Sequence, residues 1–356
     1  MTTTTTRIDW RAVDSDHRRR FEATLAGDAP DGTLATSAWQ HFPGLEYDTE
    51  ALSSAIAAQV LKHDFGWLKI NPRGIYYGEV WGAVYDDSDY GGGEVPRIVS
   101  PAWTTVDDLA GVVALPDSPV LAEQVELQAQ LRRLLPDRPL VYTVFSPLSV
   151  LLQGLGLPLY VGHPAFGPTP TLRIDELWAA DPAVLHSALG AITDTLVDFV
   201  GRLREAGADG IFYAVTGTAN PALSADEGWF AEFSTPYDQR VLHAASGGVR
   251  VLHTCGPHSH PERFVNWPVE VLHWDSFASG NPGLADLPGV VAGGVDHRIF
   301  DGDHDDEIAA QTDAARAAFG ERRFLLAPTC TVVSGGLSDG SLDLLAAASG
   351  ANRDGR

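Results

Sequence analysis

Cysteine is almost absent from this chain of 356 residues, which contains only Cys255 and Cys330. Two cysteines are too few for the disulfide framework that holds small secreted domains together. A reducing compartment keeps both residues as free thiols, available to bind a metal or to take part in chemistry. We therefore expect a cytoplasmic protein with two usable thiols.

The chain also lacks a long apolar run. No segment approaches the roughly 18 to 20 apolar residues of a membrane span. The start, MTTTTTRIDW, is polar and has no apolar segment after a basic one, so it does not resemble a secretory signal. We expect no membrane partner.

Positive charge is scarce: 24 Lys and Arg stand against 47 Asp and Glu, which gives a formal net charge of -23. The one cluster of basic residues is HRRR at 17–20. The excess of negative charge would repel the phosphates of a nucleic acid, so a nucleic-acid partner is not expected. The simplest role of the acidic side chains is to keep the protein soluble. No repeat or Pro/Ser-rich linker divides the chain. We predict one domain over 18–350, with flexible termini at 1–17 and 351–356.

Short apolar runs alternate with amphipathic segments along the chain. The runs predict strands at 37–42, 67–70, 140–145, 210–215, 249–254, 269–274, 290–293 and 324–327. The amphipathic segments predict helices at 49–63, 121–135, 183–207, 236–245, 260–266 and 305–320. This alternation, with no G-x-G-x-x-G after the first strand, favours a (β/α)8 TIM barrel with an N-terminal helical extension over a dinucleotide-binding sheet.

Reactive side chains stand at or just after the carboxyl ends of these strands, where a barrel builds its active site. They are His41, Lys69, Asn71, Ser146, Thr216, His253, Cys255, Asp275, Asp296, His297 and Cys330. From these we select His41, Lys69, Asp275 and Asp296 as candidate catalytic residues.

His253, Cys255 and Cys330 form a candidate metal site. Residues two apart on a strand point the same way, and a closed barrel brings the end of the last strand toward the others. One imidazole and two thiolates suit Zn²⁺, with the fourth position left for Asp275, water or substrate. An open position is typical of catalytic zinc.

Each of these residues also has a purely structural interpretation. A buried cysteine is often a small apolar residue, and Asp275 and Asp296 could cap the helices that follow them. His41 could be a buried histidine with its hydrogen bonds satisfied, and Lys69 could pair with a structural carboxylate. The aromatic cluster at 75–85 could line a pocket or pack in the core.

Seven stretches together resemble the uroporphyrinogen decarboxylase superfamily, and they occur in the same order. They lie at 64–86, 141–156, 207–217, 251–256 (VLHTCG), 269–275 (VEVLHWD), 289–296 and 324–332 (FLLAPTCTV). The resemblance covers most of the chain from about 18 to 348 and implies a TIM barrel with its site at the C-terminal face of the strands.

The superfamily contains two chemistries. Its decarboxylases need no metal and bind the carboxylates of a porphyrinogen through arginines in an N-terminal motif. The corresponding region here, GTLATSAWQHFPGL at 32–45, has no arginine, which argues against porphyrinogen decarboxylation.

The other branch holds zinc-dependent methyltransferases, such as cobalamin-independent methionine synthase, the methylcobamide:coenzyme M methyltransferases and epoxyalkane:coenzyme M transferase. Their zinc motif is H-x-C followed later by a second Cys, which His253, Cys255 and Cys330 match. The chain lacks the N-terminal barrel of full methionine synthase, so a methyl group carried by a corrinoid is easier to accommodate than methyl-folate.

The resemblance implies a zinc-dependent methyl- or alkyltransferase that activates a small-molecule thiol as a zinc-bound thiolate, with methylcobalamin or a small corrinoid protein as donor. Asp275 could then orient His253. Two alternatives are a decarboxylase in which Asp275 or Asp296 polarises pyrrole nitrogens, and a non-catalytic barrel that binds a corrinoid or tetrapyrrole.

Overall fold

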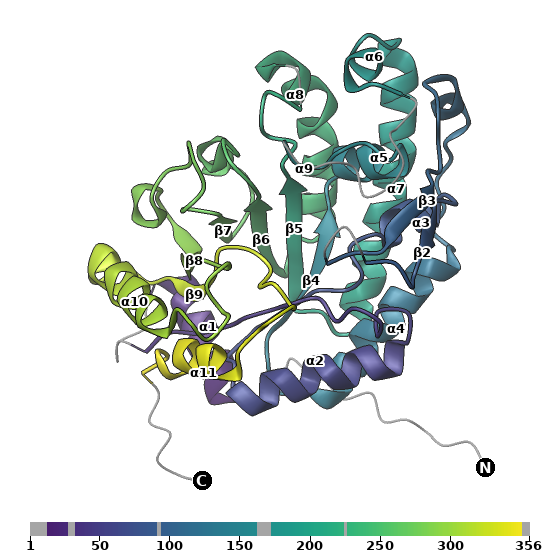
Figure 1. Cartoon of the computed structure of the whole chain (residues 1–356). Coiled ribbons are helices and arrows are strands. Elements are labelled where there is room, and N and C mark those ends of the chain that lie inside the picture. The colour runs from purple at the N-terminus through teal and green to yellow at the C-terminus, as the bar shows by residue number, and fades with distance from the viewer. Residues whose placement is uncertain (1–12, 28–32, 91–93, 162–171, 224–225, 351–356) are drawn as a thin grey trace, which may run out of the picture.

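Seven parallel strands form the centre of the molecule (Figure 1). The structure is a computed structural model that describes residues 13–27, 33–90, 94–161, 172–223 and 226–350. In sheet order the strands are β1 (Leu68–Ile70), β4 (Leu140–Phe145), β5 (Gly210–Thr216), β6 (Val249–Thr254), β7 (Val271–Trp274), β8 (Val290–Val295) and β9 (Leu325–Pro328). Seven of the eight predicted strands are therefore confirmed, and the sheet curls as in a TIM barrel.

The strand predicted at 37–42 is wrong as a regular strand, although its segment lies beside β9. Leu326 donates to the carbonyl of Ala35 at 3.1 Å and accepts from the amide of Ser37 at 3.1 Å. The next rung of this parallel ladder would need an N–H donor at Pro328, which proline does not have. On the other side, the carbonyl of Thr36 accepts from the amide of Gly66 at 2.9 Å, just ahead of β1. Among the described residues this is the single backbone hydrogen bond that links the 37–42 segment and its flank to the β1 side. A complete eight-stranded barrel of regular strands is thus not formed by the described residues.

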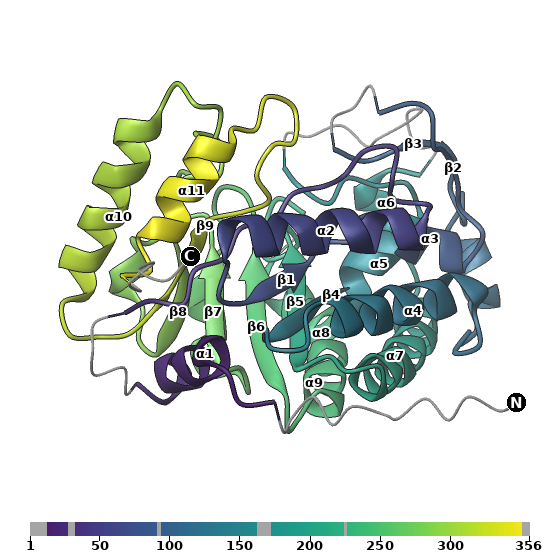
Figure 2. The same cartoon turned by 90° about the horizontal axis from the view of Figure 1, so that it is seen from below.

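Helices cover the outside of the curled sheet. The long ones are α1 (Asp16–Ala26), α2 (Thr49–His63), α4 (Pro119–Leu134), α5 (Pro147–Gly154), α7 (Pro182–Glu205), α9 (Thr235–Ala244), α10 (Asp305–Phe319) and α11 (Asp339–Ala347). Neighbours contact one another in the order α10, α11, α2, α4, α7, α9 around the outer surface (Figure 2). Five of the six predicted helices are confirmed within a few residues. The sixth, at 260–266, is only the 3-10 helix η3 (Pro261–Phe264).

Several short elements complete the fold. They are α3 (Tyr76–Val80), α6 (Ile174–Trp178), α8 (Glu227–Phe233), η2 (Asp107–Gly111), η4 (Leu284–Asp286) and an antiparallel hairpin of β2 (Val84–Asp86) and β3 (Arg97–Ser100). The hairpin and α3 are insertions after β1 that sequence patterning did not predict.

The helix α1 provides the predicted N-terminal extension. Ser15 caps it by accepting from the amide of Arg18, so the predicted boundary after residue 17 falls inside a helix. Residues 1–12 and 351–356, which we expected to be flexible, lie outside the described residues.

One helix in the described part of the chain, α7, is long and apolar enough to cross a membrane, and half of its most apolar stretch is buried. It packs against α5, α9 and β4, as a covering helix of a barrel does.

Apolar side chains fill the space enclosed by the strands. One buried cluster combines Trp39, Trp67 and Phe212 with small residues such as Ala292 and Ala327 from the opposite strands. Large and small side chains thus complement each other across the interior. Above this packed layer, toward the carboxyl ends of the strands, the interior becomes polar.

Candidate metal centre and active site

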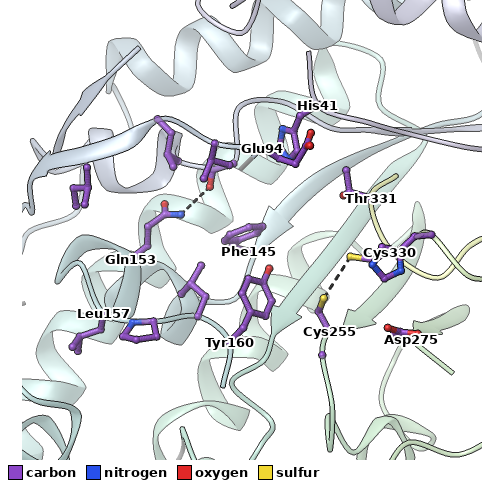
Figure 3. A pocket seen from close by; sticks show the side chains of 18 of the residues that line it. His41, Glu94, Phe145, Gln153, Leu157, Tyr160, Cys255, Asp275, Cys330 and Thr331 are labelled. Carbon is purple, nitrogen blue, oxygen red and sulfur yellow. Dashed lines mark hydrogen bonds between the residues drawn. The ribbon is translucent and has the colours of Figure 1, made fainter. Parts of the chain in front are cut away.

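Three side chains with metal-binding atoms meet at the carboxyl ends of the strands. His253 lies in β6, Cys255 follows the same strand, and Cys330 follows β9. Their ligand atoms all lie within 4.8 Å of one another. Figure 3 shows the sulfurs of Cys255 and Cys330 facing each other at one end of a cavity. The structure therefore brings together the three residues that we selected as metal ligands.

The spacing of the two sulfurs suits one shared ion. They lie 3.4 Å apart, far beyond the S–S bond length of about 2.05 Å, and both cysteines are free. Two thiolates at about 2.3 Å from one tetrahedral zinc would stand about 3.8 Å apart. A shift of a few tenths of an ångström reaches that geometry, so the donor set fits zinc.

The hydrogen bond between the two thiols shifts their pKa values in opposite directions. The hydrogen bond from Cys255 lowers the pKa of Cys330 well below its ordinary value, and His253 adds to this effect. The same bond raises the pKa of Cys255 well above the ordinary value. Of the two sulfurs, Cys330 is therefore the one that loses its proton more readily.

His253 is oriented by a second histidine, His273 of β7. Nδ1 of His273 lies 2.7 Å from Nδ1 of His253, and Nε2 of His273 lies 2.9 Å from the carbonyl oxygen of Pro328. The carbonyl can only accept, so Nε2 of His273 carries a proton. Burial and the neighbouring His253 lower the pKa of His273 well below its usual value, which keeps the ring neutral.

A neutral His273 with its proton on Nε2 must accept at Nδ1. His253 therefore donates from Nδ1, and the lone pair of its Nε2 is left for the metal. This arrangement, in which a ligand histidine donates its second N–H to a fixed partner, is typical of metal sites. Asp275, which the resemblance offered for this role, makes no hydrogen bond with His253 among the described residues, and His273 orients His253 instead.

His273 was not among the residues predicted from the sequence, although a signal for it was present. His253 and His273 are direct partners in the register of β6 and β7. Two histidines at matching positions of consecutive strands must point to the same side of the sheet.

Lys69 lies inside the barrel with 5% of its surface exposed. Its Nζ donates to Oδ1 of Asn71 at 2.7 Å and stands 4.8 Å and 5.3 Å from the ring centres of Phe212 and Trp39. Burial lowers the pKa of Lys69 to about 8, against the opposing effect of Cys330 and Cys255. Among the described residues no carboxylate forms an ion pair with Lys69, so the structural pairing that we had considered is not found.

A cavity of about 600 Å³ opens beside the two sulfurs. Its far wall is apolar and includes Ile75, Ile98, Phe145, Leu157 and Leu159, and the end near the metal site holds Asp275, His297 and Arg298. Tyr85, from the aromatic cluster at 75–85, lines this cavity, and the buried Tyr76 and Tyr77 border a smaller cavity deeper in the interior. Val80 of the same cluster packs in the hydrophobic core, so both interpretations apply, to different residues.

The remaining candidates lie around the cavity. His41 lines it, and its Nδ1 is 2.7 Å from the carboxylate of Glu46, so it is a buried histidine with a satisfied partner. Asp275 also lines it, and its Oδ1 accepts from the amide of Phe277 at 3.0 Å, which is a turn-capping contact.

Asp296 is not among the residues that line the cavity. Its two oxygens accept from Nε and Nη2 of Arg298 at 2.7 Å and 2.8 Å. Ser146 and Thr216 belong to a chain of hydroxyl hydrogen bonds through Ser149, which is a structural role.

The chain belongs to the uroporphyrinogen decarboxylase (URO-D) family, because the sequence profile of that family matches residues 87–335, more than half of its length. The resemblance noted from sequence is thereby confirmed. No curated protein matches the chain.

Solved structures show the same fold. The chain is similar to a methyltransferase from Methanosarcina mazei, with a TM-score of 0.73 and 18% identity over 94% of this chain and 98% of that one. It is also similar to a B12-independent methionine synthase from Shewanella sp. W3-18-1, with a TM-score of 0.53 and 12% identity over 89% and 97% of the two chains. At these identities the likeness establishes a shared fold.

Proposed function

We propose that this protein is a zinc-dependent methyl- or alkyltransferase that transfers a carbon group from a corrinoid or similar donor to a small thiol. The observation that carries the proposal is the convergence of His253, Cys255 and Cys330 at the end of a large cavity. The fold shared with proteins named as a methyltransferase and a methionine synthase supports it.

His253, Cys255 and Cys330 would hold a zinc ion, and that ion would supply Lewis-acid activation, lowering the pKa of the substrate thiol so that its thiolate would be available at neutral pH. His273 holds His253 in the tautomer that ligation needs. The two cysteine ligands contribute negative charge, which keeps the substrate sulfur electron-rich. The sulfur electron pair then forms the S–C bond while the bond from carbon to the donor breaks.

With methylcobalamin as donor, the electron pair of the Co–C bond stays on cobalt, and the thiol proton leaves to solvent. The apolar wall of the cavity excludes water from the reacting carbon. We further propose that the donor reaches the site through this cavity, either free or on a small corrinoid protein. Because two thiolates need a reducing compartment, we place the protein in the cytoplasm.

A decarboxylase of the porphyrinogen type is the second candidate, since the family bears that name. Binding a molecule with many carboxylates needs several cations. Among the described residues that line the cavity, Arg298 is the single arginine, and it is paired with Asp296. The cavity therefore fits this substrate poorly.

The test combines metal analysis with a transfer assay. Zinc per chain and loss of the methyl group from methylcobalamin, with 3-mercaptopropionate as thiol, are measured for the wild type, Cys255→Ala and His253→Ala. His243→Ala is the matched control, because His243 is exposed on α9. We expect about one zinc per chain and a methylated thiol for the wild type and the control, and neither for the site variants.

Other outcomes separate the alternatives. No zinc after reconstitution under reducing conditions contradicts the zinc site. Zinc without transfer to any of a panel of thiols, together with binding of a corrinoid, favours a non-catalytic barrel. Release of carbon dioxide from a porphyrinogen favours the decarboxylase. Failure of a candidate corrinoid protein to co-elute in gel filtration counts against that partner.

A further inference from the structure

One carboxylate in the large cavity is held at one oxygen and unpartnered at the other. Glu94 lies between β2 and β3 and lines the cavity whose end holds Cys255 and Cys330 (Figure 3). Its Oε1 accepts from the backbone amide of Ser334 at 3.1 Å. Its Oε2 is buried and has no hydrogen-bond partner among the described residues. Burying a carboxylate oxygen without a partner is costly, and a positively charged ligand would offset that cost.

The charges around this cavity are unbalanced. Asp275 is a second carboxylate that lines it, and Arg298 is the single Lys or Arg among the described residues that do so. Arg298 is paired with Asp296, which does not line the cavity, and its Nη2 lies 3.9 Å from Oδ2 of Asp275. Lys69 lines the smaller, deeper cavity and not this one. The lining of the large cavity is therefore negative, in a chain whose net charge of -23 attracts cations.

Aromatic rings complete the lining. Tyr85, Phe145 and Tyr160 line the same cavity, and the hydroxyl oxygen of Tyr85 is buried without a hydrogen-bond partner among the described residues. The faces of aromatic rings attract cations, and quaternary ammonium groups in particular. The apolar far wall suits the methyl groups of an alkylated cation better than it suits a hydrated metal ion.

We propose that the large cavity binds a methylated onium cation, a sulfonium or a quaternary ammonium compound, with Glu94 as its counterion, and that the protein takes a methyl group from it directly. This is a second class of donor beside the corrinoid, and the transfer rests on the proposed function of the metal site. A volume of about 600 Å³ is enough for a small organic molecule of this kind.

The transfer balances without a further reactant. The electron pair of the substrate thiolate forms the new S–C bond. The bond from the methyl carbon to the onium sulfur or nitrogen breaks, and its electron pair stays on the departing atom. The thiol proton goes to solvent, and the products are a methyl thioether and an uncharged sulfide or amine. Because opposite charges cancel as the carbon moves, an apolar cavity that excludes water favours this reaction.

The first test uses zinc-free protein, so its result depends neither on the metal nor on transfer. Choline and 3,3-dimethyl-1-butanol have the same shape and differ in charge, because carbon replaces nitrogen in the second. Saturation-transfer NMR at low salt measures the dissociation constant of each. We expect choline to bind more tightly by about tenfold or more. Equal binding of the two compounds, or binding of neither, would overturn the proposal.

Two variants locate the cation. Glu94→Gln removes the charge and keeps an acceptor oxygen for the amide of Ser334, so it should fold and lose the preference for choline. Asp87→Asn, the control, removes a charge that is exposed on the same hairpin, and it should keep the preference. A preference that persists in Glu94→Gln would show that Glu94 is not the counterion.

The zinc-loaded enzyme, assayed without a corrinoid, supplies the second readout. Trimethylsulfonium with 3-mercaptopropionate should give the methylated thiol and dimethyl sulfide, and tetramethylammonium in its place shows whether ammonium compounds also donate. Glu94→Gln should raise the KM for the onium donor by a similar factor and leave the KM for the thiol unchanged.

The outcomes separate this inference from the proposed function. Transfer from methylcobalamin but from neither cation would overturn the onium donor and leave the proposed function intact. Selective binding of choline to the zinc-free protein, without transfer from any donor, would uphold the cation site and contradict the proposed function.

Discussion

Nδ1 of His273 lies 2.7 Å from Nδ1 of His253, and the opposite nitrogen of His273 is tied to the carbonyl of Pro328, two residues before Cys330. A short line of hydrogen bonds thus joins the segment that carries one metal ligand to the ring of another. The tautomer of His253 is fixed by backbone geometry as well as by its neighbour.

The first prediction concerns this line. His273→Leu leaves Nδ1 of His253 without its acceptor, and we expect zinc affinity to fall by about 10- to 100-fold. Competition with a chromogenic chelator measures the change. The exposed-site variant His243→Ala should match the wild type, and an unchanged affinity in His273→Leu would show that the tautomer needs no support from His273.

Asp275 is the subject of the second prediction. It is absent from the cluster of metal-binding atoms, and one of its oxygens already accepts from Phe277. Asp275→Asn keeps that acceptor, so zinc affinity should stay within about threefold of the wild type, far from the loss expected of a ligand. Cys330→Ser is the comparison, since a hydroxyl is a poor zinc ligand, and chelator competition measures both. A loss in Asp275→Asn as large as in Cys330→Ser would make Asp275 the fourth ligand.

The third prediction follows from a buried acid away from the site. Asp238 accepts hydrogen bonds from Tyr213 at 2.5 Å and Ser234 at 2.6 Å, and burial raises its pKa to about 7 against their effect. The unfolded chain releases this proton near pH 4. Between about pH 4 and pH 7 the native state therefore holds a proton that the unfolded state lacks, and stability falls as the pH rises.

Replacing Asp238 by Asn removes that titration. We expect the pH dependence of the free energy of unfolding to become flatter over this window, by at most about 1.4 kcal/mol per pH unit. Urea titrations at pH 5, 6 and 7 measure the slope. The control is Asp313→Asn, an exposed change on α10, which should keep the wild-type slope. A wild-type slope in Asp238→Asn as well would show that burial does not raise the pKa of Asp238.

The fourth prediction concerns the opposite end of the barrel. Asp209 accepts from Arg18 at 2.8 Å and from Arg132 at 2.6 Å, and 9% of its side chain is exposed. Asp209→Asn would remove the charged carboxylate that both buried guanidinium groups share, at a cost on the order of 3–5 kcal/mol. The exposed pair of Asp194 and Arg240 provides the control, because Asp194→Asn should cost under about 1 kcal/mol. Urea unfolding measures both, and equal effects would argue against the buried pair.

Much of the fold could be predicted from sequence because buried parallel strands are short apolar runs. The runs at 140–145 and 249–254 coincide with β4 and β6. The failure at 37–42 has a local cause that pattern does not reveal: the partner strand carries Pro328 at the position where a donor is needed. The β2–β3 hairpin was missed because its residues are largely exposed and show no apolar run.

The site was partly predictable for a related reason. Cys255 and Cys330 stood out because cysteine is rare, and strand periodicity joined His253 to them. The lysine in the barrel was noticed, but the small cavity beside it is also lined by Trp39 and Asn71, which come from separate segments. Which residues from separate segments meet in space can be seen only in the folded structure. The same holds for Asp296, which pairs with Arg298 and does not line the cavity.

The separation of the two cysteines along the chain has a consequence for how the fold is held together. They are 75 residues apart, so an ion that binds both closes a loop containing β7, β8 and β9. By the chain-entropy relation used for covalent links, closing such a loop is worth about 4 kcal/mol. Zinc would then act as a removable cross-link between the middle of the chain and its C-terminal part. The stability of the folded protein would therefore depend on whether the metal is available.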